Sequence, residues 1–514
     1  MYTNNSKPAP DKRVMKTENP NNNKEISMNK SITEGKDLTG PVFQPLPKEC
    51  KYSRDISDNA CPVFDQLCDW LREWSPRSDE KYYEAVGIFI LSTIAARRVS
   101  YDFGKTRYTS LQILLIGRTG LTRKSTVATC GLELLSHIGL DYLLVPDMMS
   151  PQMLVNIMSM KVPEKIEKMS SEEQEITKVK VGFSGQRGWL HDEFGTTFVS
   201  MLKSDKNDSI FRKLFRQFDD TPEKFSLAGI TRGTDVITRP YLAFLGGLTI
   251  ADMAPWCKRG SALWRDGLMA RMALVSADNI VSKERFPQGK LTFPSQVVDV
   301  LSDWHHRLGS PKVSLHPTLK VIPPIGQHLL LPQEVLDAYY AYDEALIDMM
   351  AQWNCTDLDG NYVRFPEKAM RIAALFASLA GSDSIELPHW VKAREITEGW
   401  RGNLHDLYPQ LIADSPPPKL SIDERVFRCL QVHGDLRSRE IQQKTRIKKT
   451  EVEEALNILR DKGWTREYPD GNTIRYAAVE HESSLLGVER RHVDDISQPR
   501  NTYVNRSSIR YRND

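Results

Sequence analysis

The chain has 514 residues, of which 40% are hydrophobic and 26% are charged. A prior of roughly 150 residues per domain predicts about three units, and the composition excludes collagen-like, low-complexity and disulfide-scaffold proteins. Lysine plus arginine (69) nearly balance aspartate plus glutamate (67), which leaves a net charge of +2. Any affinity for nucleic acid must therefore come from local basic surfaces.

The sequence carries no strong signal for membrane insertion or secretion, and none for paired or metal-binding cysteines. We find no run of about 18 apolar residues, so we expect no membrane partner. Residues 1–36 lack the apolar stretch of a secretory signal peptide, and a cytoplasmic location follows by default. The seven cysteines are far apart and form no C-x-x-C pair, so we expect free thiols and no zinc site.

The composition changes along the chain in a way that predicts separate parts. Polar residues dominate both ends, which are typical of disordered tails. Between residues 56 and 290, buried strands alternate with helices, the pattern of an α/β domain with a largely parallel sheet. Helical periodicity then dominates, and a Pro-rich linker precedes a last compact region. The expected parts are tail 1–55, core 56–290, helical region 291–412, linker 413–421, compact region 422–479 and tail 480–514.

The strongest chemical signal is the loop between a buried strand and a helix, with the sequence Gly-Arg-Thr-Gly-Leu-Thr-Arg-Lys-Ser-Thr. Backbone N–H groups of a tight loop and a helix N-terminus can cradle phosphates, a lysine can reach the β- and γ-oxygens, and a hydroxyl can bind Mg²⁺. The predicted nucleotide-binding residues are Gly117, Gly120, Arg123, Lys124, Ser125 and Thr126.

This loop is a variant of the usual pattern. Arg123 stands where glycine normally precedes the lysine, and Lys124 lies one residue farther from Gly117 than usual. The alternative interpretation is a basic turn capped by Ser125 that binds no ligand.

A second signal is the strand 188–191, which ends in the adjacent carboxylates Asp192 and Glu193. In this pattern Asp192 would hold Mg²⁺, and Glu193 would polarise the attacking water. An Asp-Glu pair at a strand end can also be a solvated turn, so the inference depends on the loop upstream.

Two further residues are candidates for sensing or stabilising the γ-phosphate. Thr249 follows a predicted strand, although it could equally cap the next helix. Arg271 precedes another strand and could act in trans on a neighbouring subunit, although a lone arginine is more often a surface ion-pair partner.

The order of these parts over roughly residues 60–410 resembles the AAA+ type helicase ATPases of prophage and plasmid primase-helicase proteins. The resemblance is carried by the loop, by the Trp-Leu-His-Asp-Glu-Phe-Gly and Phe-Leu-Gly-Gly-Leu-Thr segments, by Gly-Leu-Met-Ala-Arg-Met, and by the helical stretch 368–376. It implies an α/β P-loop core with a parallel sheet and a helical lid over 291–412.

The resemblance also implies an activity and partners. The implied cofactors are ATP and Mg²⁺, and the implied assembly is an oligomer, typically a hexamer. The implied partners are single-stranded or forked DNA and a primase supplied in trans. In such ATPases an arginine of the lid is often a second nucleotide sensor, and Arg371 is the matching position. Its alternative is a charge on the wet side of an amphipathic helix.

Residues 422–479 have a different pattern. Three helical segments precede two strand-like segments around a Pro-Asp-Gly-Asn turn, which predicts a winged helix. The predicted DNA-contacting residues are Arg446, Lys448, Lys449 and Thr450, the last also a predicted helix N-cap, and Arg475 on the wing. Winged helices also mediate protein contacts, and a basic cluster is often simply a solvated face.

The sequence thus favours an ATP-dependent DNA helicase or replication ATPase of a mobile genetic element. Two alternatives stay open. One is a P-loop DNA-binding adaptor or regulator that does not hydrolyse ATP, suggested by Arg123 and the winged helix. The other is a defence or partition ATPase that does not unwind DNA.

Overall fold

The computed structural model describes residues 41–159, 162, 166–203, 209–229, 233–277, 283–314, 320–353, 355–413, 422–471 and 473–479. Residues 1–40, 480–514 and 414–421, which belong to the predicted tails and linker, lie outside the described residues. The chain divides into two compact units. We call residues 36–418 the larger unit and the described residues 422–479 the C-terminal unit.

The larger unit contains a four-stranded parallel sheet with the order β4-β7-β3-β8. Its strands are β3 (Gln112–Ile116), β4 (Gln186–His191), β7 (Tyr241–Leu248) and β8 (Met272–Ser276). Every residue in these strands is buried, as expected for a parallel sheet covered on both faces. The α/β fold class with a parallel sheet is therefore confirmed.

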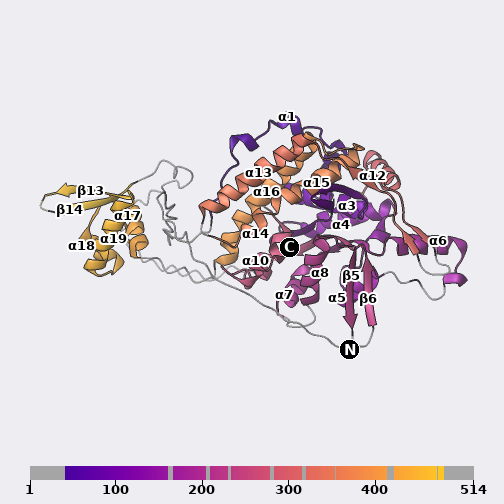
Figure 1. The fold of residues 1–514 in the computed structure, drawn as a ribbon, viewed down its shortest axis with the longest axis horizontal. Coiled ribbons are helices and arrows are strands. Elements are labelled where there is room, and N and C mark those ends of the chain that lie inside the picture. The colour runs from indigo at the N-terminus through magenta and orange to yellow at the C-terminus, as the bar shows by residue number, and fades with distance from the viewer. Residues whose placement is uncertain are drawn as a thin grey trace, which may run out of the picture. The chain divides into compact units, whose positions relative to one another are not determined.

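One buried helix organises the packing around the sheet. Helix α3 (Glu80–Ala95) contacts all four strands and helix α4 (Lys124–His137), and Figure 1 shows α3 and α4 in the middle of the unit. Nearly all of its side chains are buried, which explains why it is apolar around its whole circumference. Asp79 is the N-cap of this helix, and its carboxylate accepts a hydrogen bond from the Lys81 N–H.

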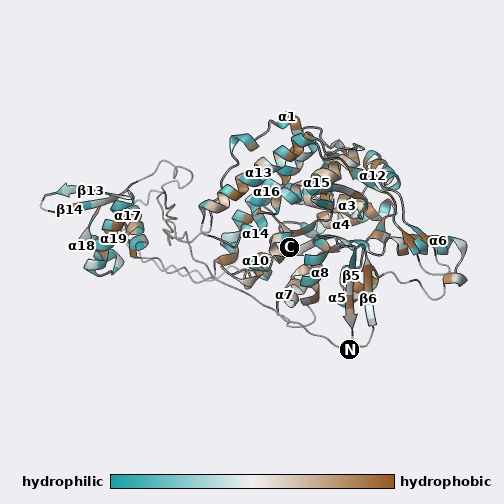
Figure 2. Cartoon of the chain, in the orientation of Figure 1, coloured by the Kyte–Doolittle hydropathy of each residue, from teal (hydrophilic) through white to brown (hydrophobic). Residues whose placement is uncertain are grey.

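The remaining helices surround this centre. Long helices such as α13 (Gln333–Gln352) and α16 (Leu387–Ile412) mix hydrophobic and hydrophilic residues around their circumference (Figure 2), as expected for helices with one buried face. The other helices of the larger unit are α1 (Arg54–Ser57), α2 (Pro62–Trp74), α5 (Pro151–Met158), α6 (Ser171–Gly182), α7 (Phe194–Lys203), α8 (Ser209–Asp219), α9 (Ile250–Met253), α10 (Ala262–Arg265), α11 (Leu268–Arg271), α12 (Ser295–Arg307), α13 (Gln333–Gln352), α14 (Asp359–Tyr362), α15 (Phe365–Ala380) and α16 (Leu387–Ile412). Among the described residues, no helix is long and apolar enough to cross a bilayer.

Short strands complete the unit. The added strands are β1 (Val99–Phe103), β2 (Lys105–Tyr108), β5 (Lys224–Gly229), β6 (Gly233–Thr238), β9 (Lys312–Ser314), β10 (Lys320–Ile322) and β11 (Gln327–Leu329). Strands β5 and β6 form an antiparallel hairpin between α8 and β7. Because β9, β10 and β11 lie within residues 291–412, the expectation that this region is entirely helical is wrong. Strand β11 pairs in parallel with β1, whose partner could not be read from local periodicity.

The predicted tail 1–55 extends too far. Residues 41–55 include a 3₁₀ helix, η1 (Lys48–Cys50), and pack on the larger unit. Leu46 and Cys50 are buried, and the Gln44 carbonyl accepts a hydrogen bond from Arg401. A few apolar anchors are enough to fix this segment, although it lacks periodicity. All seven cysteines have free thiols.

The C-terminal unit has three helices and a three-stranded antiparallel sheet of order β12-β14-β13. Its elements are α17 (Ile422–His433), β12 (Leu436–Arg437), α18 (Ser438–Thr445), α19 (Lys449–Asp461), β13 (Thr465–Asp470) and β14 (Thr473–Ala478). The three helices and the hairpin lie where the sequence predicts them, and β12 is an addition. A small core from all three helices holds the unit together, including Val426, Leu430, Ile441, Val452, Leu456 and Leu459.

Candidate functional site

The loop between β3 and α4 is tight. The Gly117 N–H donates to the Leu248 carbonyl at 3.2 Å, which ties the loop to the end of β7. A Cβ atom at Gly117 would lie 2.5 Å from the Tyr82 hydroxyl oxygen and 2.5 Å from Thr122 Oγ1. Only glycine fits at this position, so the first residue of the motif is fixed by packing.

Arg123 occupies the position that the usual motif gives to glycine. Its φ of 52° lies in the left-handed region, as does the φ of 72° at Gly120. That region favours glycine because it has no Cβ. Arg123 therefore reproduces the backbone conformation that glycine would supply. Its guanidinium lies over the Phe286 ring, 5.8 Å from the centroid, and that of Arg77 lies 5.3 Å from the same centroid.

Lys124 is the first residue of α4, and its Nζ donates to the Gly117 carbonyl at 2.7 Å. Burial lowers the pKa of Lys124, and the nearby carboxylates of Asp192 and Asp252 partly oppose this effect. A half-buried ammonium group between a loop and two carboxylates is suited to bind an anion together with a cation. Ser125 follows Lys124 in the first turn of α4, where backbone N–H groups have no helical partner.

Asp192 and Glu193 directly follow β4, with Asp192 half-buried and Glu193 exposed. Strand β7 lies between β4 and β3, so its end adjoins both the carboxylates and the loop. A Cβ atom at Gly247 would lie 2.1 Å from the Asp192 carbonyl oxygen. Glycine is thus required for this close approach of the two strand ends.

Thr249 caps helix α9. Its Oγ1 accepts from the Asp252 N–H at 3.2 Å and donates to Asp252 Oδ2 at 2.7 Å. The alternative that the sequence left open, an N-cap, is therefore what the structure contains. Thr249 also lines the cavity described next, so capping and ligand contact are compatible.

These elements enclose a cavity of about 400 Å³ at the carboxyl edge of the sheet. This volume is in the range of ordinary ligand pockets. A smaller cavity of about 190 Å³ adjoins it and shares Arg118 and Thr122. The larger cavity is lined by Arg118, Thr119, Gly120, Thr122, Arg123, Lys124, Ser125, Thr126, Asp192, Glu193, Gly195, Thr196, Gly247, Leu248, Thr249 and Asp252.

The structure thus brings most of the predicted nucleotide-site residues together, although they come from segments up to 132 positions apart along the chain (249 minus 117). Gly117 lines the smaller cavity. Sequence reasoning missed Asp252, which lies three residues after Thr249, the spacing of a capping box. That spacing was the available signal.

The oxygen-bearing side chains at the cavity suit a magnesium ion that is coordinated by both the protein and the phosphates of a ligand. Among the described residues, no group of three or more histidine, cysteine, aspartate or glutamate side chains could hold a metal. The Ser125 hydroxyl and the Asp192 carboxylate are hard oxygen ligands, and Mg²⁺ is often held by one or two protein groups plus substrate phosphates.

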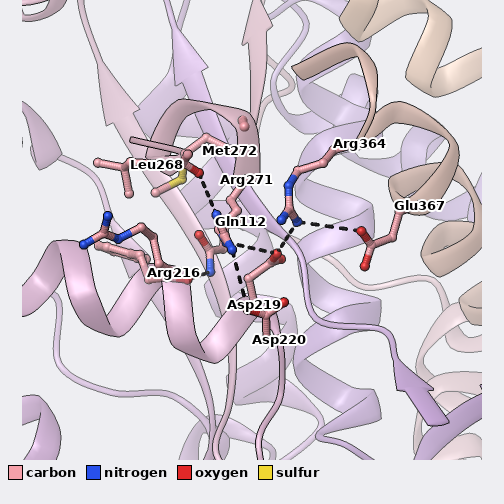
Figure 3. A network of polar contacts seen from close by, with 12 residues as sticks. Gln112, Arg216, Asp219, Asp220, Leu268, Arg271, Met272, Arg364 and Glu367 are labelled. Carbon is pink, nitrogen blue, oxygen red and sulfur yellow. Dashed lines mark hydrogen bonds and ion pairs between the residues drawn. The ribbon is translucent and has the colours of Figure 1, made fainter. Parts of the chain in front are cut away.

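Arg271 lies away from this cavity within its own chain. It directly precedes β8, whose first residue pairs with Gln112, the first residue of β3. The loop follows the other end of β3, roughly 15 Å farther along the strand. Figure 3 shows Arg271 directed at Asp219 and Asp220, with nitrogen-oxygen distances of 3.5 Å to each.

Arg371 lies at the same amino edge of the sheet and is 4% exposed. Its guanidinium donates to the Ser110 carbonyl at 2.8 Å, to Asp219 Oδ1 at 2.6 Å and to Glu367 Oε1 at 2.6 Å. The expectation that Arg371 senses nucleotide in its own subunit is therefore corrected, because both terminal nitrogens of its guanidinium are hydrogen-bonded at the opposite end of the strands. It is not on the wet side of its helix either.

Three arginines, Arg271, Arg364 and Arg371, surround the Asp219 carboxylate. Arg364 also donates to Asp219 Oδ2 at 2.8 Å and lies between that carboxylate and Glu367 (Figure 3). Burial alone would raise the pKa of Glu367, but Arg371 and Arg364 outweigh it and lower that pKa to about 2. These contacts join helices α8, α11 and α15 at the amino edge of the sheet.

In the C-terminal unit, four of the predicted DNA-contacting residues surround the start of α19. Arg446, Lys448, Lys449 and Thr450 are all exposed. Helix α19 begins at Lys449, with Lys448 at the N-cap position. Thr450 is therefore the second helical residue and not the N-cap, a shift of two positions that is common at helix ends.

Arg475 is less free than predicted. Its Nε donates to Asp470 Oδ2 at 2.7 Å, and its Nη1 donates to the Asp435 carbonyl at 2.8 Å. Arg437 donates to the same Asp470 oxygen. Hydrogen bonds from Arg475 and Arg437 lower the pKa of Asp470, and the guanidinium of Arg475 is bound to groups of its own unit.

Comparisons with known proteins show little. No family model matches the chain, and no curated protein matches it. Among solved structures, the chain is similar to a full-length MCM homologue from Methanopyrus kandleri at 13% identity and a TM-score of 0.35. The match covers 70% of this chain and 62% of that one. A likeness at this level carries no argument on function.

Proposed function

We propose that the chain binds ATP in the 400 Å³ cavity and hydrolyses it to act on DNA. The observation that carries the proposal is the convergence of Lys124, Asp192 and Thr249 on one cavity, each at the carboxyl edge of a different strand of one parallel sheet. Ligands bind preferentially at this edge of open α/β sheets.

The cavity supplies what a triphosphate needs. The loop and the N-terminus of α4 offer backbone N–H groups, and Lys124 offers a cation. The exposed guanidinium-bearing residues Arg118 and Arg123 also line the cavity and add positive charge. The adjoining 190 Å³ cavity lies between the loop, the end of β8 and helix α16, and it is the place that we assign to the nucleoside.

Ser125 and Asp192 would hold Mg²⁺, which offsets the negative charge of the phosphates. Glu193 is exposed at the cavity and unpaired among the described residues, so its carboxylate can accept a proton from the attacking water. The water oxygen forms the new bond to the γ-phosphorus while the bond to the β-bridging oxygen breaks. Thr249 and Asp252 keep the end of β7 in place beside this reaction.

The role that we propose for Arg271 is at the nucleotide of a neighbouring subunit and not at that of its own chain. Its side chain is 16% exposed, its nitrogen-oxygen distances to Asp219 and Asp220 are 3.5 Å, and its Nη1 donates to the Gly267 carbonyl at 3.0 Å. The role in trans, the homo-oligomer and its hexameric size all rest on the sequence analysis.

The C-terminal unit supports a DNA substrate. Its three helices and hairpin are the elements that the proposed winged helix requires, and the exposed basic residues lie at the start of its third helix. In helix-turn-helix geometry that position meets phosphates and groove edges. A role in replication of a prophage or plasmid, with a primase in trans, rests on the sequence resemblance alone.

Steady-state ATP hydrolysis tests the proposal, measured for the wild type, Glu193→Gln and the matched control Glu172→Gln, with and without single-stranded DNA. Glu172 is an exposed glutamate of α6 outside the cavity. We expect DNA-stimulated turnover that falls at least 100-fold in Glu193→Gln only. Nucleotide binding without turnover in the wild type would contradict the proposal and favour the adaptor function.

A further inference from the structure

The last residue of β4, His191, directly precedes the carboxylates of Asp192 and Glu193. It is 2% exposed, and its ring packs on that of Trp189 at a centroid distance of 5.4 Å. Both rings lie on the same face of the sheet, as positions i and i+2 of a strand do. His191 is not among the described residues that line the ATP cavity, so any effect on the ligand must pass through other residues.

One ring nitrogen of His191 reaches across the turn that carries the two carboxylates. Its Nε2 lies 2.9 Å from Thr197 Oγ1 in the first turn of α7, which begins at Phe194. Only residues 192 and 193 separate β4 from α7. The imidazole therefore joins the end of the strand to the start of the helix and spans the turn between them.

The other ring nitrogen of His191 faces Asp147. Its Nδ1 lies 2.8 Å from Asp147 Oδ1, and a carboxylate can only accept a hydrogen bond. The contact is favourable when Nδ1 carries the proton, so in a neutral ring Nε2 accepts from the Thr197 hydroxyl. The carboxylate thus fixes the tautomer and the orientation of the imidazole.

Asp147 is itself held by β4. The Trp189 indole N–H donates to the Asp147 carbonyl at 2.8 Å. Two positions earlier, the Val145 N–H donates to the Gly188 carbonyl at 2.9 Å, and this segment runs parallel to the strand. The carboxylate that orients His191 is therefore fixed by the same strand that carries the histidine.

The start of α7 also forms part of the wall of the ATP cavity. Gly195 and Thr196 line this cavity. A Cβ atom at Gly195 would lie 2.6 Å from Asp252 Oδ2, so the helix start lies tightly against α9. Because Glu193 directly precedes α7, a shift of the helix start would shift this carboxylate relative to the bound phosphates.

We propose that His191 is a positioning residue for ATP hydrolysis, which holds Glu193 at the attacking water through Thr197 while Asp147 orients the ring. The inference rests on the proposed ATPase function and adds a group that acts on it from outside the cavity. A general base must lie within hydrogen-bond reach of the proton that it accepts, and a misplacement of about 1 Å can cost about 100-fold in rate. In the proposed site the loop and Lys124 bind the phosphates, so the affinity for ATP should not depend on His191.

Steady-state ATP hydrolysis, together with titration of a labelled ATP analogue, tests this role on the full chain. Thr197→Val removes the hydroxyl and keeps the shape of the side chain, and Thr197→Ser keeps the hydroxyl. His191→Phe keeps the aromatic packing and removes both ring nitrogens. The matched control is Thr177→Val, at a half-buried threonine of α6 outside the cavity.

We expect kcat to fall at least tenfold in Thr197→Val and in His191→Phe, while the affinity for the ATP analogue changes less than twofold. Thr197→Ser and Thr177→Val should hydrolyse ATP like the wild type. Because Thr197 acts through His191, the double variant His191→Phe/Thr197→Val should lose no more activity than the more impaired single variant. Two independent structural losses would multiply instead.

Asp147→Ala provides a second test at a side chain that is 54% exposed, for the case that circular dichroism melting curves show the other variants to be unfolded. We expect its kcat to fall about threefold, because the ring loses its orienting carboxylate. The inference is overturned if Thr197→Val, or Asp147→Ala in that case, hydrolyses ATP as fast as the wild type, or if the loss lies in ATP affinity alone. A wild type that does not hydrolyse ATP would contradict the proposed function itself, and this inference with it.

Discussion

The ammonium group of Lys124 donates a hydrogen bond to the carbonyl oxygen of Gly117 at 2.7 Å. The bond joins the first residue of α4 to the first residue of the preceding loop and closes the loop upon itself. A phosphate that enters the cavity would compete with this carbonyl for the ammonium group. The loop is thus held in shape by the same group that we expect to bind the ligand.

Lys124→Ala should therefore abolish ATP binding with little loss of stability. Because burial lowers the pKa of Lys124, its charged form is disfavoured in the folded chain, and removing it relieves that penalty. We expect at least a 100-fold weaker affinity in fluorescence titrations with a labelled ATP analogue and a melting temperature within a few degrees of the wild type. Unchanged affinity would refute the assignment of the cavity.

Arg123→Gly should keep ATP binding. Glycine adopts the left-handed conformation of residue 123 without strain, while Arg123→Val should cost about 1 kcal/mol or more, because β-branched residues rarely adopt it. Denaturant unfolding and ATP titration of both variants provide the measurement. Loss of binding in the glycine variant would mean that the arginine side chain itself is needed.

The network around Asp219 predicts a loss of stability in acid. Glu367 has a pKa of about 2 in the folded chain, below its ordinary value of 4.5. Its contribution is therefore complete above pH 4.5 and disappears as the pH falls towards 2. The shift corresponds to about 3 kcal/mol.

Thermal melting between pH 5.5 and 2.5 should show this difference. The midpoint of the wild type should fall more steeply than that of Glu367→Gln, while Glu172→Gln should follow the wild type. Parallel curves for the wild type and Glu367→Gln would contradict the low pKa.

In the C-terminal unit, the double variant Lys448→Ala/Lys449→Ala should weaken DNA binding and reduce its dependence on salt. Each lost phosphate contact lowers the slope of log affinity against log salt by about 1. Arg475→Ala should change affinity much less, because its guanidinium is bound to Asp470 and to the Asp435 carbonyl. Fluorescence anisotropy with single-stranded and forked DNA at several salt concentrations distinguishes these outcomes.

The sequence predicted the parts of the site whose signals are local. The loop from Gly117 to Thr126 and the pair Asp192-Glu193 each follow a short apolar strand, and hydrophobic runs and turn residues are contiguous in sequence. The three C-terminal helices and the hairpin were predictable for the same reason. The observed boundaries of these C-terminal elements differ from the predicted ones by only one or two residues.

Local sequence patterns could not identify contacts between residues that are distant along the chain. The partner of Arg371 is Asp219, 152 residues away, so the local sequence does not show that the arginine is already bound. Residues 41–55 lack periodicity, and their anchors contact α13 and α16, hundreds of positions later. Periodicity describes the faces of an element but does not identify what covers them.

The position of β7 has a consequence for assembly. The loop and the carboxylates follow strands β3 and β4, which are not neighbours, because β7 lies between them. A fragment that ends before Tyr241 would contain both motifs intact, yet it would lack the strand that sets their spacing. If the cavity binds nucleotide as proposed, we therefore expect a chain truncated before β7 not to bind it, so nucleotide binding would report that β7 has paired on both sides.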